Sequence, residues 1–150
     1  MSYLDRDVDV MRYQGQAFNW IGFDELTQWP TPYPWNYMRS RLRTTKASGL
    51  PLYMRATSNP GGPGHQWVKK SFIDPETPNK SFWATDTDTG EVICWPKGHT
   101  KEGEPLFKRR FIPANLFDNP YLADDGMYEA NLLSLPEHQR RQLLEGDWDI

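Results

Sequence analysis

The chain has 150 residues, which suffices for one domain with a buried core but not for two. With 37% hydrophobic and 25% charged residues, its composition excludes a disordered chain. The net charge of −3 excludes attraction of the whole molecule to nucleic acid. Any such contact must therefore come from a local basic surface or from neighbouring parts of a larger assembly.

Cysteine content and hydropathy limit the cellular compartments that the sequence is compatible with. Cys94 is the only cysteine, which excludes an internal disulfide and a cysteine-based zinc site. No apolar run approaches the roughly 20 residues needed to span a bilayer, and the acidic N-terminus lacks the apolar segment of a signal peptide. These features predict a soluble protein of a reducing, intracellular compartment, with no membrane partner.

Two apolar runs in the first half of the chain predict strands that lead into polar loops. Residues 18–23 form a bulky run with little alternation, which is typical of a strand buried on both faces of a parallel sheet. Residues 50–57 form the second run, which enters the proline- and glycine-rich loop 58–64. We expect the two strands to be parallel neighbours whose polar ends share one sheet edge. Helices are predicted over residues 35–45 and 65–73.

The second half of the chain predicts a hairpin, a strand and two helices. Residues 76–105 predict a peripheral hairpin insertion that adds little to the core, because two strand-like runs flank an Asp-Thr-Gly turn. Residues 107–112 predict a third core strand. Helices are predicted over residues 124–133 and 135–145, the second with a capping box that begins at Ser134. Together the elements predict an α/β domain.

Asp24 and Glu25 stand directly after the first apolar run. At the carboxyl end of a parallel strand, such side chains reach the crevice in which α/β folds bind ligands. In a nucleotide hydrolase, the first acid would hold Mg²⁺ and the second would activate the attacking water. Successive strand residues point to opposite faces, so adjacent acids can share these tasks only where the strand ends and turns. Taken alone, the pair is more simply interpreted as two solvated acids that end a strand.

Thr57, Ser58 and Asn59 occupy the equivalent position after the second run. Adjacent hydroxyl and amide groups can sense a γ-phosphate and report its loss, although alone they fit ordinary turn chemistry. The Pro-Gly-Gly-Pro-Gly stretch that follows is not a phosphate-binding loop. It lacks the Gly-Lys-Ser/Thr ending, and its prolines carry no amide donor. No other stretch of the sequence supplies such a loop.

Three basic residues are predicted to share one helix face. Arg39, Arg43 and Lys46 lie at i, i+4 and i+7 of the helix expected over residues 35–45 and just beyond it. Such a stripe can contact a DNA backbone or an acidic neighbouring subunit. A solvated helix face is the more common explanation of the same pattern.

Seven short segments follow one another along nearly the whole chain from about residue 9. They are residues 13–15, 21–27, 39–43, 54–62, 111–114, 118–122 and 144–149. In this order they resemble the large subunit of the tailed-phage terminases, which package viral DNA. Residues 21–27 are similar to the family's Walker B region, and residues 54–62 are similar to the segment that contains its coupling motif. The ordered series is more specific than any single motif.

The resemblance implies part of a RecA-like P-loop NTPase motor. Residues 1–122 would be the Walker B half of the ATPase domain, with the hairpin as an insertion at about 76–105. Residues 123–150 would be a helical linker towards a nuclease domain. In the complete motor, hydrolysis of ATP with Mg²⁺ drives double-stranded DNA into a procapsid.

The resemblance also implies roles for individual residues and a set of partners. Asp24 would be the acid associated with Mg²⁺, and Glu25 the base that activates water. Residues Thr57, Ser58 and Asn59 would form the coupling segment. Members of the family also use an arginine that acts on a neighbouring subunit's ATP, and Arg12 is the candidate here. The implied partners are double-stranded DNA, the portal protein, the small terminase subunit and further large-subunit copies in a ring, in the cytoplasm of a bacterial host.

Three hypotheses follow from these features. The first is a motor fragment that functions when a partner supplies the phosphate-binding loop. The second is a non-catalytic product, either a prophage remnant or a small protein that binds terminase, portal or DNA. The third is a fragment of a helicase-type ATPase, which the long Asn-Pro-Gly-Gly-Pro-Gly stretch and the Asp-Asn-Pro-Tyr-Leu segment disfavour. The family's Walker A segment and nuclease acids have no counterpart among the 150 residues.

Overall fold

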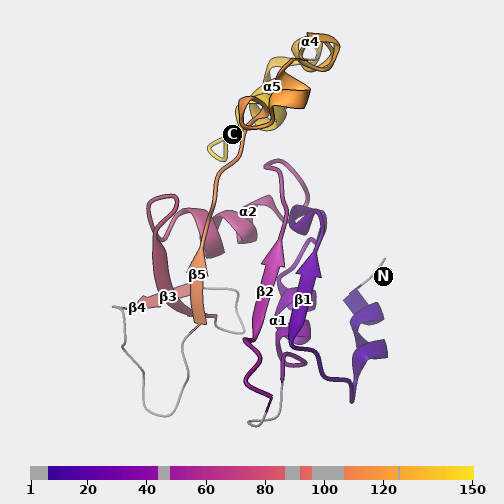
Figure 1. The fold of residues 1–150 in the computed structure, drawn as a ribbon, viewed down its shortest axis with the longest axis vertical. Helices are drawn as coiled ribbons and strands as arrows, with labels where there is room; N and C mark the ends of the chain where they lie inside the picture. Colours follow the sequence, from indigo (N-terminus) through magenta and orange to yellow (C-terminus); the bar gives the residue numbers. More distant parts are fainter. Residues whose placement is uncertain (1–6, 44–47, 87–91, 96–106, 125) are drawn as a thin grey trace.

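The computed structural model describes residues 7–43, 48–86, 92–95, 107–124 and 126–150, and it is mixed α/β (Figure 1). Strands β1 (Trp20–Phe23) and β2 (Tyr53–Ala56) form a two-stranded parallel sheet. A second sheet has the order β4-β3-β5 and is antiparallel; its strands are β3 (Ser81–Asp86), β4 (Val92–Trp95) and β5 (Phe107–Arg110). The predicted α/β class is therefore confirmed. Within the described residues, no helix is both long and apolar enough to cross a bilayer.

The parallel pairing of the first two strands agrees with the prediction. Trp20 lies opposite Tyr53, and Phe23 lies opposite Ala56, so both strands end at the same edge. The expectation of a strand buried on both faces was wrong, because β1 alternates between exposed and buried residues. Trp20 is 50% exposed, whereas Ile21 is buried among the core residues. One face of this sheet is thus packed and the other is open.

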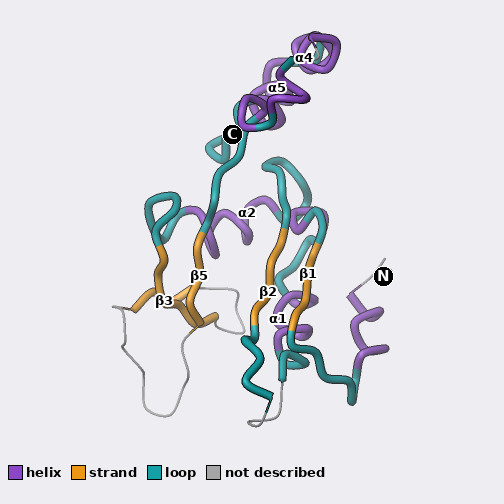
Figure 2. The backbone as a smooth tube through the Cα atoms, in the orientation of Figure 1, coloured by secondary structure: helices purple, strands orange, loops and turns teal. Residues whose placement is uncertain are grey.

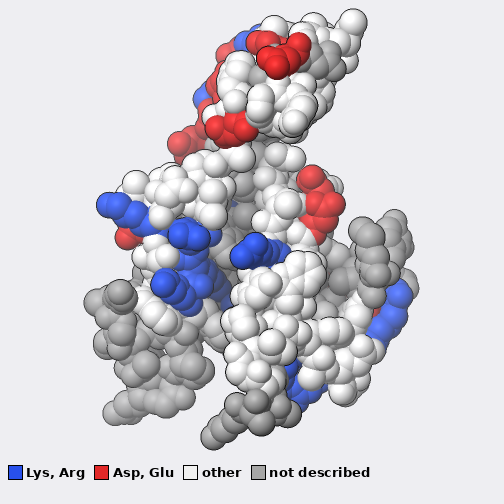
Figure 3. All heavy atoms as spheres, viewed as in Figure 1, with Lys and Arg blue, Asp and Glu red and all other residues white. Residues whose placement is uncertain are grey.

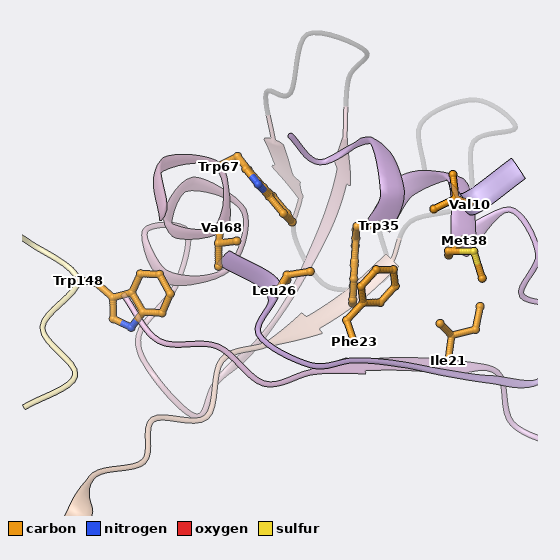
Figure 4. Packing of buried hydrophobic residues seen from close by; sticks show 9 residues of the cluster. All are labelled: Val10, Ile21, Phe23, Leu26, Trp35, Met38, Trp67, Val68 and Trp148. Carbon is orange, nitrogen blue, oxygen red and sulfur yellow. The ribbon is translucent and has the colours of Figure 1, made fainter. Parts of the chain in front are cut away.

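The packed face is covered by the helices that follow each strand (Figures 1 and 2). These are α1 (Tyr33–Arg39), α2 (His65–Val68) and the π-helical turn η3 (Lys69–Ile73), which continues α2 and confirms the helix predicted over 65–73. The 3-10 helix η1 (Asp7–Tyr13) contributes the fully buried Val10. The core is drawn in Figure 4, and its buried members are Val10, Ile21, Phe23, Leu26, Trp35, Met38, Trp67, Val68 and Trp148.

Helix α1 is shorter than the helix predicted over 35–45. It begins at Tyr33, with Pro34 in its first turn, and it ends at Arg39. The chain then pairs with the segment before β1: the Phe18 amide donates to the Arg41 carbonyl at 2.9 Å, and the Arg43 amide donates to the Phe18 carbonyl at 2.8 Å. Helical hydrogen bonds cannot continue through residues whose amides and carbonyls serve this bridge. The tertiary pairing therefore ends the helix.

The third predicted core strand belongs to a different sheet. Strand β5 pairs antiparallel with β3, with Arg109 opposite Phe82, rather than with β1 or β2. The predicted hairpin is confirmed by the antiparallel pairing of β3 with β4, while its turn lies outside the described residues. The expectation that this hairpin adds little to the core was only partly right. Phe82 and Ala84 are buried, although neither belongs to the main cluster.

The C-terminal part is helical, as predicted, and it extends beyond the carboxyl ends of β1 and β2 (Figure 1). It consists of a 3-10 helix η4 (Leu116–Asp118) and helices α3 (Pro120–Ala123), α4 (Gly126–Leu133) and α5 (Glu137–Leu144). The capping box predicted at Ser134 was wrong. The Ser134 hydroxyl instead donates to the Asn131 carbonyl at 2.6 Å, and Pro136 is the residue before α5. A capping box exists at Asn115 and Asp118.

The last residues of the chain are anchored on α2. The ring of Trp148 stacks on His65, with centroids 5.3 Å apart, and the Trp148 carbonyl lies 3.1 Å from His65 Nε2. His65 Nδ1 accepts from the Gly61 amide at 2.9 Å, so Nε2 carries the proton donated to Trp148. Lys69 pairs with Asp149 at 3.1 Å, and Arg141 pairs with Asp147. The contacts of Trp148 with His65 and the Lys69–Asp149 ion pair therefore hold the C-terminus against the domain, whereas the Arg141–Asp147 pair joins the chain end to α5.

We expect the turn between α5 and the chain end, which Asp147 holds, to lose stability in acid. A hydrogen bond from the Asp149 amide and the pairing with Arg141 hold the pKa of Asp147 below its usual 3.8. Because the folded pKa is lowered, the stabilisation is present above the usual value and is lost as the pH falls through the lowered value. In urea titrations from about pH 6 to about pH 2, Asp147→Asn should remove this part of the pH dependence. Parallel pH profiles for the two proteins would contradict the prediction.

Candidate functional site

The loops after β1 and β2 are joined at the shared sheet edge, as the parallel register requires. The Thr57 amide donates to the Phe23 carbonyl at 3.0 Å, and the Leu26 amide donates to the Thr57 carbonyl at 2.9 Å. These bonds continue the strand pairing past the last paired residues. The carboxyl edge of the sheet therefore presents Asp24 and Thr57 side by side.

The Thr57 hydroxyl links the two acids of the first loop. It donates to Asp24 Oδ1 and accepts from the Glu25 amide at 3.1 Å. All three residues are exposed. The hydroxyl thus fixes one carboxylate oxygen of Asp24 and leaves the other open to solvent.

Glu25 adopts a left-handed backbone conformation, with φ 54° and ψ 57°. This region is uncommon for a residue with a long side chain and costs on the order of 1 kcal/mol or more. The turn separates the Glu25 side chain from the direction of the strand. The extended conformation of β1 thus ends between Asp24 and the 3-10 turn at Leu26, where the sequence analysis expected the chain to turn.

The second loop is held by Thr27, a residue that the sequence analysis did not include among the site residues. Thr27 is 1% exposed, its amide donates to Ser58 Oγ at 3.1 Å, and its hydroxyl donates to the Asn59 carbonyl at 2.7 Å. The signal for it was a hydroxyl residue shortly after the acid pair. Asp24, Glu25, Thr57, Ser58 and Asn59 thus form one hydrogen-bonded loop cluster around Thr27.

The glycines after Asn59 allow a close approach between the two loops. A Cβ on Gly62 would lie 2.5 Å from the Thr27 carbonyl oxygen, and one on Gly64 would lie 2.0 Å from that of Trp29. Gly61 has φ 95°, and a Cβ there would meet the Gln142 side chain of α5 at 2.5 Å. The glycine-rich stretch therefore serves packing against the first loop and the C-terminal helix.

The donor set at this edge suits a magnesium ion that arrives with a nucleotide. Mg²⁺ is usually held by one or two carboxylates, while waters and phosphate oxygens fill its other positions. Asp24 offers a free carboxylate oxygen beside the Thr57 hydroxyl. Among the described residues, no group of three or more His, Cys, Asp or Glu side chains is placed to hold a metal ion by itself.

The remaining candidate residues lie elsewhere. Arg12 is on η1 and pairs with Asp9 at 3.2 Å; none of the contacts described joins it to the loop cluster. Arg39 and Arg43 do not share a helix face, because α1 ends at Arg39. Arg39 Cζ lies 4.3 Å from the ring centre of Phe107. Lys46 lies outside the described residues. Their roles towards DNA or a neighbouring subunit stay predictions.

The fold and the loop cluster define the molecule as a mixed α/β protein with polar groups at the carboxyl edge of a parallel strand pair. Comparisons of the chain with family models, with curated proteins and with solved structures found no match.

We expect Thr57→Val to remove the side-chain link between the two loops while preserving the shape of the side chain and the backbone bonds of Thr57. The substitution removes the donor to Asp24 and the acceptor for the Glu25 amide, which should lower the free energy of unfolding by about 1 kcal/mol. Thr57→Ser keeps the hydroxyl and is the matched control. Urea denaturation of the three proteins measures the difference. Equal stability of the valine and serine variants would show that the hydroxyl contributes nothing.

Proposed function

We propose that this chain is the Walker B half of a terminase large subunit, the ATP-driven motor that packages double-stranded DNA into a procapsid. In this proposal its domain is a partial RecA-like P-loop fold over residues 1–122, and residues 123–150 are the linker towards a nuclease. The observation that carries the proposal is the contact between the Thr57 hydroxyl and the Asp24 carboxylate at the end of two parallel strands. It joins the acid proposed for Mg²⁺ to the segment proposed for coupling.

Each residue of the loop cluster has a role in the proposed reaction. Asp24 would hold Mg²⁺, and the magnesium would supply charge neutralisation at the phosphates. Glu25, turned aside by its backbone conformation, accepts a proton from the attacking water. Thr57 shares one hydroxyl between Asp24 and the Glu25 backbone, so a change in either is transmitted to β2.

The wider assembly follows from the same proposal. The phosphate-binding loop comes from another polypeptide segment, since Pro-Gly-Gly-Pro-Gly packs on the first loop and has no Gly-Lys-Ser/Thr ending. Double-stranded DNA, the portal protein, the small terminase subunit and further large-subunit copies would be the partners, in a bacterial cytoplasm. Arg12 would act on a neighbouring subunit's ATP.

The test is complementation. The purified chain is mixed with a polypeptide that ends a strand in a Gly-Lys-Ser/Thr loop, and phosphate release is measured with Mg²⁺, ATP and double-stranded DNA. We expect turnover in the mixture that Asp24→Asn abolishes. Asp124→Asn, the same change at an exposed carboxylate of the C-terminal part, should leave it intact. A mixture without turnover, although the two polypeptides bind each other, would favour the non-catalytic remnant or binding protein.

A further inference from the structure

A long groove separates the two sheets. Its volume is about 1160 Å³, which exceeds the usual range of small-molecule pockets. It is lined without interruption by residues 52–60 along β2 and by residues 107–115 along β5. Figures 1 and 2 show β5 on the side of β2 that faces away from β1, with both strands running in the same direction. The groove therefore has the length and course of an extended strand.

Both walls of the groove are strand edges. In the part of the chain that the structure describes, β2 is an outer strand of its sheet and β5 is an outer strand of the other. Tyr53 and Thr57 donate their amides to the segment of β1, at 3.3 and 3.0 Å. Backbone groups alternate along a strand, so the amides of Met54 and Ala56 face the groove. An outer edge of this kind is a template for another strand.

The floor of the groove is apolar, and one of the residues that line it, Trp35, has a buried indole N–H without a partner in the described part of the chain. Leu26, Trp35, Val68 and Phe72 line it from the helix side. Trp35 is 7% exposed, and its buried indole N–H has no hydrogen-bond acceptor among the described residues. Buried N–H groups in native proteins are nearly always hydrogen-bonded. The signal of the Trp35 indole N–H therefore reports changes in the packing of the groove floor.

The open side of the groove is basic along β2 and β5, while the acids Asp118 and Glu145 line the groove beyond the ends of the strands. Arg55 of β2 and Lys108 and Arg110 of β5 are exposed, whereas Arg109 turns inward, with its guanidinium 5.0 Å from the ring centre of Phe72. Figure 3 shows Lys and Arg side chains gathered over β5 and β2 on this face. A strand seated between them would place alternate residues on the apolar floor and on the basic face. The residues of the inserted strand that point to the basic face would therefore be acidic.

We propose that the groove between β2 and β5 receives a strand of a partner polypeptide, apolar towards the helices and acidic on the open face, which joins the two sheets into one. Strand addition of this kind takes its affinity from main-chain hydrogen bonds and its specificity from alternate side chains. The proposal concerns an interaction surface and does not require that the chain take part in ATP hydrolysis. Failure of either proposal therefore leaves the other standing.

The test uses the full chain and a synthetic peptide of about nine alternating Val and Glu residues, a length that matches the lining runs. Nitrogen-15 NMR follows the Ala56 amide and the Trp35 indole N–H, the latter assigned through Trp35→Phe. We expect saturable shifts of both signals and weaker binding of the matching Val and Lys peptide. An absence of saturable binding, or equal binding of the Lys peptide, would overturn the proposal.

Two variants locate the binding edge. Ala56→Pro removes a groove-facing amide and should weaken the Val and Glu peptide at least about tenfold, whereas Ala56→Val keeps the amide and should bind like the parent protein. If the proline variant fails to fold, Arg55→Glu tests the proposal in its place. This variant should bind the Val and Lys peptide more tightly than the Val and Glu peptide, the reverse of the parent protein. Unchanged binding of Ala56→Pro, or unchanged preference of Arg55→Glu, would overturn the proposal. Self-association of the parent chain would also overturn the proposal if Ala56→Pro abolished it, because the strand in the groove would then come from a second copy of the chain.

Discussion

Gly64→Ala should lower the free energy of unfolding by roughly 3 kcal/mol, the upper part of the range for overpacked sites. Gly64 is buried where the loop after Asn59 enters α2, and its amide donates to the Thr27 carbonyl at 2.7 Å. A Cβ at this position would lie 2.0 Å from the Trp29 carbonyl oxygen and 2.5 Å from Trp67 Nε1. One of these atoms is backbone, so no side-chain rotation relieves the clash.

The same methyl group would also disturb the hydrogen bond between Trp67 and the Trp29 carbonyl. Trp67 Nε1 donates to the Trp29 carbonyl at 2.8 Å, and the new Cβ would press on both partners. Gly126→Ala is the matched control, because a Cβ there has nothing within 4 Å and lies in the first turn of α4. Its stability should stay the same or rise by about 0.5 kcal/mol. Urea denaturation of the two variants compares them, and equal stability would contradict the close packing of the two loops.

The candidate site could be predicted from the sequence because it depends on patterns among neighbouring residues. Two apolar runs that each end in polar residues predict parallel strands with a common edge, and Asp24 and Thr57 do lie in contact there. The run length and the abrupt change of polarity are properties of neighbouring residues. They need no knowledge of how distant segments meet.

The errors arose where tertiary contacts override local preference. The helix predicted over 35–45 ends at Arg39, because the Arg41 carbonyl and the Arg43 amide pair with the backbone of Phe18 instead of continuing the helix. The sequence of β5 resembles a core strand, and only its pairing with β3 places it in the second sheet. Thr27 stands shortly after the acid pair in the sequence, but its hydrogen bonds to Ser58 and Asn59 depend on how the two loops meet in the fold.

The purified chain by itself should not hydrolyse ATP. A nucleotide triphosphate is held by several loop amides and a lysine that neutralise its phosphates, and most of the rate enhancement depends on that positioning. The glycine-rich loop cannot replace them. The Gly61 amide donates to His65 Nδ1 at 2.9 Å, the Gly64 amide donates to the Thr27 carbonyl at 2.7 Å, and two prolines carry no amide. Two amides of this loop are thus engaged within the fold, and its two prolines have none to offer.

A steady-state phosphate-release assay with Mg²⁺ and double-stranded DNA measures this prediction. The expected rate equals that of a blank, and neither Glu25→Gln nor the control Glu137→Gln changes it. Turnover by the isolated chain that Glu25→Gln abolishes would show that the prediction is wrong and that a phosphate site lies elsewhere in these 150 residues. In the complemented mixture, Glu25→Gln should lower the rate by about 10²- to 10⁴-fold, the loss expected for a general base, while Glu137→Gln should leave it unchanged. The contrast between the two glutamates then assigns the base to the left-handed turn after β1.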